Sequence, residues 1–248
     1  MRREKKSKKN QGFTLIELMI VIAIIAIIAA IAIPGLLSSQ RASNERNASA
    51  SLKTMASAEA DFRGNDRDGN HVQDFWTVDV AGLFSLCPTG AAEPIKLIEL
   101  SVCLADTSST AVQAGGVAAG TEPLIATFGV QAAKAAYWYR ACLTDETATA
   151  YALATNGQPP WTAVVAFNTA KFGFFAFPDT RSTGRNLFFV NENNTIYKRG
   201  VNQTYIRPDT NAVPSTAIAA GTLVSAVAGG PEVWPTDAQL AADYSKLD

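Results

Sequence analysis

Glu17 is the first residue whose type and position together suggest chemistry. It is the one charged residue in the run from 13 to 33, which is otherwise apolar apart from a threonine. A carboxylate inside a bilayer costs about 3 kcal/mol or more unless a partner offsets the cost. We therefore interpret Glu17 as a functional residue that pairs with a buried positive charge. The alternative is that it lies at the membrane surface and reaches water, although its side chain is short for that role.

A second group of residues has the spacing of metal ligands. Positions 1, 3, 5, 7 and 9 of a calcium-loop pattern are filled by Asp66, Asp68, Asn70, Val72 (through its carbonyl) and Asp74. Hard oxygen ligands at this spacing suit Ca²⁺. However, His71 replaces the usual glycine of the sharp turn, and Thr77 replaces the bidentate glutamate. The pattern predicts a weak calcium site, and the alternative is an acidic turn that caps a helix end.

The three cysteines, Cys87, Cys103 and Cys142, form no C-x-x-C pair, so a zinc ribbon or thioredoxin-like motif is not indicated. If this part of the chain lies outside the cytoplasm, a disulfide is permitted. Cys87 and Cys103 are the nearest pair in sequence, and we predict a bridge between them that leaves Cys142 free. Other pairings, and lone buried thiols, stay open as alternatives.

The charge distribution and the missing motifs exclude several classes of function. Six basic residues and one acidic residue lie in the first twelve positions, and without this block the formal net charge changes from −1 to −6. Because the rest of the chain is acidic, nucleic-acid binding is not expected. The single histidine, His71, and the lack of a P-loop, G-x-S-x-G or dinucleotide fingerprint give no catalytic constellation. We therefore do not expect an enzyme.

The element that must hold Glu17 is a membrane-spanning helix. At 1.5 Å per residue, the run from 13 to 33 covers about 30 Å, the thickness of the hydrocarbon layer. The run is longer than a secretory signal core, and no A-x-A-like cleavage site follows it. The basic flank predicts a cytoplasmic N-terminus, with the remainder of the chain carried across the membrane.

Gly12 separates the basic segment from Phe13, so that the sequence reads KKNQG-FTLIE. This stretch closely resembles the class III signal of type IV prepilins and type II secretion pseudopilins. The resemblance implies that a prepilin peptidase/methyltransferase removes the basic leader 1–12 by cleaving after Gly12, and methylates the new N-terminus on Phe13. It also implies that Glu17 neutralises the Phe13 amine of a neighbouring subunit, which would offset the desolvation of both charges.

The same resemblance implies a location and partners. The precursor would be a single-pass protein of the bacterial inner membrane, with a cytoplasmic N-terminus and an extracytoplasmic body. It would then join a periplasmic or surface filament of identical subunits. Its partners would be the peptidase, other pilin or pseudopilin subunits, and an inner-membrane assembly platform.

Beyond the span, Pro34-Gly35 predicts a kink or local melting of the helix, unless the proline merely marks the membrane exit. Helical periodicity then resumes and predicts one long helix over 13–63, ending at Gly64. Charged residues such as Glu59 occupy its other faces. Its second half is amphipathic, with an apolar stripe formed by Leu37, Ala48, Leu52, Met55 and Phe62.

The remaining residues, 64–248, are predicted to form one globular domain of antiparallel strands. Strand-like runs occupy 137–143, 161–167, 172–177, 187–190 and 195–199, and the last two are expected to form a hairpin. A small, polar stretch at 105–124 predicts a surface loop. The tail after about 207 has no clear period, and it either wraps the sheet or stays loose. A long helix packed on an antiparallel sheet is an α+β arrangement, as the pilin fold would require.

The leading interpretation is therefore a structural filament subunit, in either a type IV pilus or a type II secretion pseudopilus. The alternative is a minor pilin whose body acts as a binding or adhesion module at a filament tip. An exposed patch formed by Trp76, Trp138, Trp161 and Trp234 would favour that alternative, whereas core packing is the commoner fate of tryptophan. A membrane-tethered enzyme ranks lowest.

Overall fold

The computed structural model describes residues 13–68, 72–77, 79–86, 93–107, 132–142, 168–201, 240–242 and 244–247. The chain divides into two compact units, Met1–Gln40 and Arg41–Asp248. We call the second unit the head. The division falls inside one long helix, α1 (Leu15–Gly64), so the second half of α1 is part of the head.

The predicted single helix is confirmed, since α1 runs for 50 residues. Pro34 lies inside it, and the residues on both sides of Pro34 are helical. The predicted local melting at this position is therefore not found. A proline in a helix removes one main-chain hydrogen bond, and the alanine and leucine residues around this step favour helix strongly enough to keep it continuous.

The end of α1 is closed by Asp66 rather than by the predicted glycine. Gly64 is the last helical residue, but Asp66 adopts the left-handed conformation with φ of 46°. The Arg67 N–H then donates to the Phe62 carbonyl at 3.2 Å, the long-range bond of a Schellman motif. Arg67 also forms an ion pair with Asp61 at 2.8 Å across the same turn.

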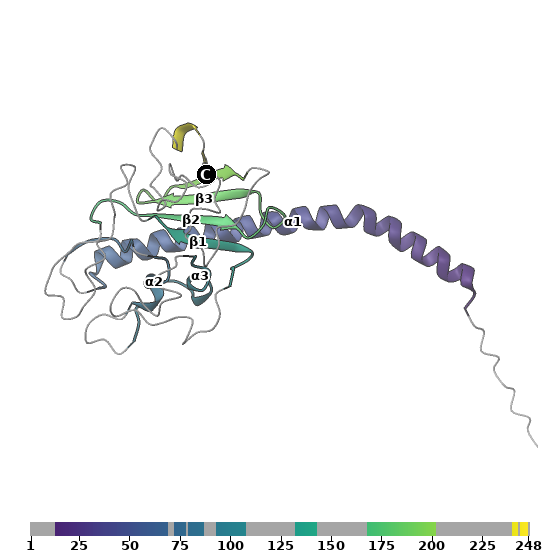
Figure 1. Cartoon of the computed structure of the whole chain (residues 1–248), viewed down its shortest axis with the longest axis horizontal. Helices are drawn as coiled ribbons and strands as arrows, with labels where there is room; N and C mark the ends of the chain where they lie inside the picture. The colour runs from purple at the N-terminus through teal and green to yellow at the C-terminus, as the bar shows by residue number, and fades with distance from the viewer. Residues whose placement is uncertain are drawn as a thin grey trace, which may run out of the picture. The chain divides into compact units, whose positions relative to one another are not determined.

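Five strands form one antiparallel sheet in chain order (Figure 1). They are β1 (Tyr137–Ala141), β2 (Gly173–Pro178), β3 (Asn186–Asn191), β4 (Ile196–Gly200) and β5 (Ser245–Leu247). Neighbouring aromatic residues fix the register, as where Phe175 lies opposite Phe189 with ring centroids 4.7 Å apart. The first four strands match predicted runs, and β3 and β4 form the predicted hairpin. The predicted strand 161–167 lies outside the described residues.

The sequence did not decide whether the C-terminal tail packs on the sheet, and the structure places the end of this tail in the sheet as β5. β5 pairs with β4, with Lys246 opposite Tyr197, and so covers the edge of the sheet. At the opposite edge, Asp106 bridges Tyr139 of β1. The β1 edge thus has an additional main-chain partner, and the other edge is formed by the short strand β5; both features reduce pairing with other chains.

The second half of α1, the sheet and two short helices, α2 (Gly82–Ser85) and α3 (Leu100–Cys103), share one hydrophobic core. Four stripe residues of α1 are fully buried in it: Ala48, Leu52, Met55 and Phe62. The fifth, Leu37, is 45% exposed because it precedes the head, so the predicted stripe is wrong at its first member. Glu59, which was assigned to a face outside the apolar stripe, is fully buried.

Candidate processing and assembly site

Thr14 and Glu17 form a capping box at the start of α1. The Thr14 N–H and hydroxyl donate to the Glu17 carboxylate at 2.8 and 2.6 Å, and the Glu17 N–H donates back to the Thr14 hydroxyl oxygen at 3.3 Å. These bonds use main-chain donors that a helix start leaves without internal partners. The structure therefore holds Glu17 at a fixed place one turn into the helix.

This arrangement leaves part of the Glu17 carboxylate open. Both bonds from Thr14 reach the same oxygen, Oε2, and no described residue donates to Oε1. An ammonium group brought by another chain could therefore bind Oε1 without breaking the capping box. Sequence reasoning missed Thr14, although the T-x-x-E spacing is itself the signal of a capping box. Of the predicted cleavage pair, Phe13 is 91% exposed and Gly12 lies outside the described residues.

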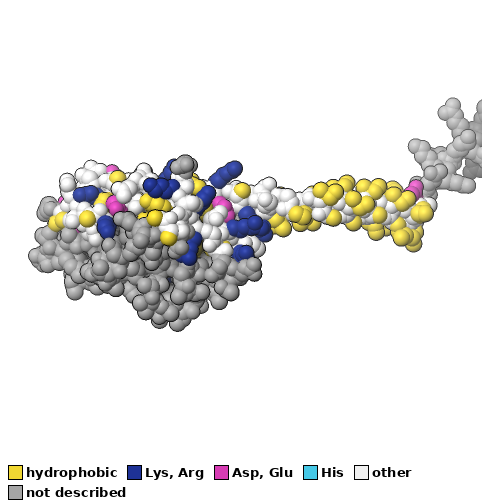
Figure 2. Space-filling view, turned by 90° about the horizontal axis from the view of Figure 1, so that it is seen from above, with side chains coloured by type: hydrophobic (Ala, Val, Ile, Leu, Met, Phe, Trp, Pro, Cys, Tyr) yellow, Lys and Arg dark blue, Asp and Glu magenta, His cyan; other side chains and the backbone are white. Residues whose placement is uncertain are grey.

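The surroundings of this site are apolar and exposed. Among the described residues, every exposed large hydrophobic side chain lies between Phe13 and Leu37. Figure 2 shows hydrophobic side chains along the helix outside the head. In length and composition, α1 is sufficient to cross a membrane. Exposing so much apolar surface to water is strongly unfavourable. The first half of α1 therefore requires an apolar partner, either lipid or other helices.

In the head, Glu59 of α1 forms a hydrogen bond with the segment that follows the helix. Its Oε2 accepts the Trp76 N–H at 2.9 Å, and the Trp76 ring lies 5.9 Å from that of Phe62. Burial raises the pKa of Glu59 well above its ordinary value. The hydrogen bond from the Trp76 N–H lowers this pKa in part, and the negative charge of Asp74 raises it. The contact explains why an acidic residue lies on the core face of α1.

Asp79 and Asp106 form a second buried group of carboxylates beside α2. Asp106 accepts the N–H groups of Val80 and Ala81 at 2.7 and 2.9 Å. Asp79 accepts the Gly82 N–H at 2.5 Å and the Trp76 indole N–H at 3.2 Å. Burial, followed by the charge of Asp106, raises the pKa of Asp79 to about 7. These bonds fix a turn of main chain, which is a structural role.

The residues of the predicted calcium loop do not converge in the described structure. Asp68 and Asp74 are buried, Asp66 and Val72 are half-buried, and Asn70 lies outside the described residues. Within the part of the chain that the structure describes, no three His, Cys, Asp or Glu side chains are grouped to hold a metal ion. The calcium site stays a prediction without structural support. Asp66 instead closes α1, as the alternative interpretation expected.

The predicted disulfide between Cys87 and Cys103 is not formed at Cys103, which carries a free thiol. Cys87 lies outside the described residues. The Cys103 side chain is fully buried, and its Sγ donates to the Ala81 carbonyl at 3.4 Å. Burial raises the pKa of this thiol, and the charges of Asp106 and Asp79 raise it further. Cys103 therefore stays protonated and behaves as a core residue. Cys142 is also buried.

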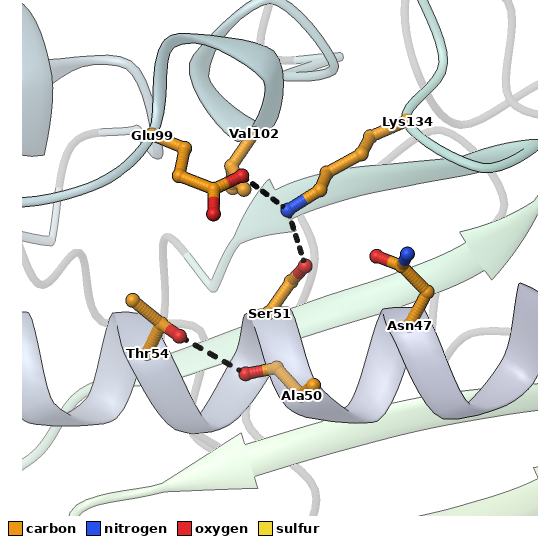
Figure 3. Close-up of a pocket in the computed structure, with 7 residues that line it drawn as sticks. All are labelled: Asn47, Ala50, Ser51, Thr54, Glu99, Val102 and Lys134. Carbon is orange, nitrogen blue, oxygen red and sulfur yellow. Dashed lines mark hydrogen bonds and ion pairs between the residues drawn. The ribbon is translucent and has the colours of Figure 1, made fainter.

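A hollow of about 310 Å³ lies beside α1 and contains a lysine (Figure 3). Lys134 Nζ binds Glu99 Oε2 at 2.7 Å and Ser51 Oγ at 3.1 Å. These bonds join α3 and the segment before β1 to the helix. Because its charge is paired, Lys134 has a structural role, connecting these segments, and is not a reactive amine. The hollow is lined by Asn47, Ala50, Ser51, Thr54, Glu99, Val102 and Lys134.

The fold and the N-terminal site together define a class of protein: a long helix on an antiparallel sheet, with a T-L-I-E motif at the start of an exposed apolar span. Residues 7–33 match the family model of the prokaryotic N-terminal methylation motif. The chain therefore carries an N-terminal methylation motif at the start of its apolar span.

One relative is similar over part of the chain. Over 62 residues the chain is 48% identical to the type IV major pilin protein PilA of Myxococcus xanthus (strain DK1622). The match covers 25% of this chain and 28% of that protein, so the chain spans about a quarter of the length of the relative. No solved structure matches the chain.

Proposed function

We propose that this chain is a structural subunit of a type IV pilus, held in the bacterial inner membrane until it joins the filament. A prepilin peptidase removes residues 1–12 by cleavage after Gly12, and the new N-terminus at Phe13 is methylated. The observation that carries the proposal is the methylation motif at 7–33, followed by an apolar span whose large side chains are exposed.

Assembly of the filament depends on the Glu17 carboxylate. Within the chain its Oε2 is bound by Thr14, while Oε1 has no described donor. In a filament, the Phe13 ammonium of a neighbouring subunit would pair with this carboxylate in the apolar core formed by the bundled helices. Because the pair offsets two desolvation costs, and because either charge alone is strongly unfavourable there, it also selects the axial stagger between subunits.

Two observations favour a pilus subunit over the other candidates. The relative with 48% identity is named as a type IV major pilin, which supports a pilus rather than a secretion pseudopilus. Trp76 and Trp138, two of the four residues that would form an aromatic binding patch, are buried in the core. Trp161 and Trp234 lie outside the described residues. A tip-binding module has correspondingly less support than a filament subunit.

The basic flank before Phe13 supports an orientation with the N-terminus in the cytoplasm and the head outside. The partners are then the prepilin peptidase/methyltransferase, other pilin subunits and an inner-membrane assembly platform.

Intact-mass and N-terminal peptide analysis of the protein from its own membranes and filaments tests the processing step. We expect a chain that begins at methylated Phe13. If residues 1–12 were retained in cells with an active prepilin peptidase, the chain would be an ordinary membrane-anchored protein.

Replacement of the assembly carboxylate tests the second step. We expect Glu17→Ala to be processed but to give no detectable filaments, because a buried ammonium would be left without a partner. Glu93→Ala is the matched control, since Glu93 is an exposed acid of the head that pairs with Lys96. Normal filaments from the Glu17→Ala variant would exclude the proposed charge pair.

A further inference from the structure

Three arginines of the head lie together around one hollow. Arg41 of α1 and Arg181 and Arg185 of the turn between β2 and β3 line a space of about 380 Å³ with Ser182. Arg181, Ser182 and Arg185 are exposed, and Arg41 is half-buried. Figure 2 shows Lys and Arg side chains gathered on the part of the head that contains the first turns of its helix.

The turn that carries Arg181 and Arg185 is fixed to α1. The Arg41 guanidinium donates to the Ser182 carbonyl at 2.7 Å, and the Asn44 amide donates to the Thr183 carbonyl at 3.0 Å. Within the turn, the Gly184 N–H donates to the Thr180 carbonyl at 3.2 Å. The hollow is therefore pre-organised, because the main chain beneath the two exposed arginines is held at several points.

The arginine charges are not neutralised within the described chain. No described carboxylate forms an ion pair with any of the three guanidinium groups. The nearby Glu45 instead binds the Arg185 main-chain N–H at 2.9 Å and the Asn186 amide at 2.8 Å. Asp179 accepts the Trp138 indole N–H at 2.8 Å. The acids that could pair with the arginines are thus used to position the turn.

The position of the cluster along the chain indicates its partner. Arg41 follows Leu37, the last exposed large hydrophobic residue of α1, by four positions of the same helix. Eight residues separate it from Ile33, which is about 12 Å of helix. A span that ends near Ile33 therefore places Arg41 at the depth of the lipid headgroups or just outside them. Arginine binds phosphate oxygens through two parallel N–H groups, which suits it to this layer.

We propose that Arg41, Arg181 and Arg185 form a binding site for the phosphate of an anionic phospholipid headgroup, on the membrane face from which the head emerges. The proposal rests on the proposed membrane insertion of residues 13–33. The head, residues 41–248, contains 15 basic and 20 acidic residues, so its net charge is −5 and an anionic membrane repels the head as a whole. The arginine cluster provides the local attraction that holds one face of the head against the bilayer before assembly.

The test uses the mature full chain, reconstituted in nanodiscs of phosphatidylcholine with phosphatidylglycerol. Spin-labelled forms of the two lipids report which lipid is immobilised by the protein. We expect the wild type to favour phosphatidylglycerol by about tenfold, and Arg181→Gln with Arg185→Gln to remove most of this preference. Raising the salt to about 0.5 M should weaken the preference of the wild type, because the site is open to solvent.

A matched control removes the same charge from elsewhere on the head. Lys53→Gln with Lys246→Gln replaces two exposed lysines, on α1 and β5, outside the residues that line the hollow. This variant should keep the lipid preference of the wild type. Equal thermal melting of the three proteins would show that the substitutions leave the fold intact.

Three results would overturn the proposal. The first is an inserted wild type without lipid preference, which would remove the lipid site and leave the filament function untouched. The second is an arginine variant that keeps its lipid preference but fails to enter filaments, which would assign the arginines to an acidic face of a neighbouring subunit. The third is a chain that does not enter nanodiscs, which would remove the membrane span and this proposal together.

Discussion

The two halves of α1 have the same secondary structure and opposite surroundings. In the first half, large side chains such as Ile16 and Ile27 are 65% exposed. In the second half, Leu52, Met55 and Phe62 are fully buried against the head. The first half is apolar on every face, whereas the second half is apolar along one stripe only. Helical propensity alone does not distinguish them.

The difference shows what each half needs in order to be stable. A helix with one apolar stripe can satisfy it within its own chain, and the second half does so. A helix that is apolar all round cannot be covered by one small head, so it must find lipid or other helices. The two environments proposed for this protein, the membrane and the filament core, both provide such cover. The following substitutions test the comparison.

Phe62→Ala should have the largest effect on the head. Its ring is fully buried and packs on Trp76, so truncation should cost about 4 kcal/mol of unfolding free energy. Ile27→Ala removes a large side chain from the first half of α1 and should leave the stability of the head unchanged. Denaturant unfolding of the detergent-solubilised chain, followed by tryptophan fluorescence, measures both. Similar losses of unfolding free energy in the two variants would contradict the proposed difference between the two halves of α1.

Asp79→Asn should change the pH dependence of the head. The pKa of Asp79 rises from 3.8 in the unfolded state to about 7 in the folded state. As the pH increases, Asp79 therefore loses its proton at a lower pH in the unfolded state than in the folded state. Stability should therefore be full at acidic pH and decline as the pH rises between these values, by about 4 kcal/mol at most. The asparagine variant should lose this part of the decline, measured by thermal melting at pH values across that window. An unchanged decline would show that Asp79 ionises normally in the folded head.

Thr14→Ala should have the smallest effect, at the start of the first half. Loss of the capping hydroxyl should destabilise the first turn of α1 by about 1 kcal/mol and speed hydrogen exchange of its amides. Thr14→Ser should restore the protection, because serine provides the same hydroxyl. Thr54→Ala is the control, since the Thr54 hydroxyl donates only to the Ala50 carbonyl within the helix. Unaltered exchange in Thr14→Ala would show that the capping box is dispensable.

The long helix, its apolar first half and four of the strands were predictable because each leaves a local pattern. The apolar run at 13–33 and the stripe from Ala48 to Phe62 have a clear length or period. β5 was missed because Ser245–Leu247 is short, and its strand character comes from pairing with β4. Glu59 was misplaced because its partner, the Trp76 N–H, is 17 residues away in sequence.

The sequence by itself determined the methylation motif, the apolar span and the α+β class, because these depend on residues that are neighbours along the chain. Only the tertiary structure showed that Glu59, Asp79 and Asp106 are buried against main-chain N–H groups, and that Cys103 is a free thiol. It alone brought Arg41 beside Arg181 and Arg185. Such groups form where distant segments meet, and the free energy of each contact depends on partners that no local pattern records.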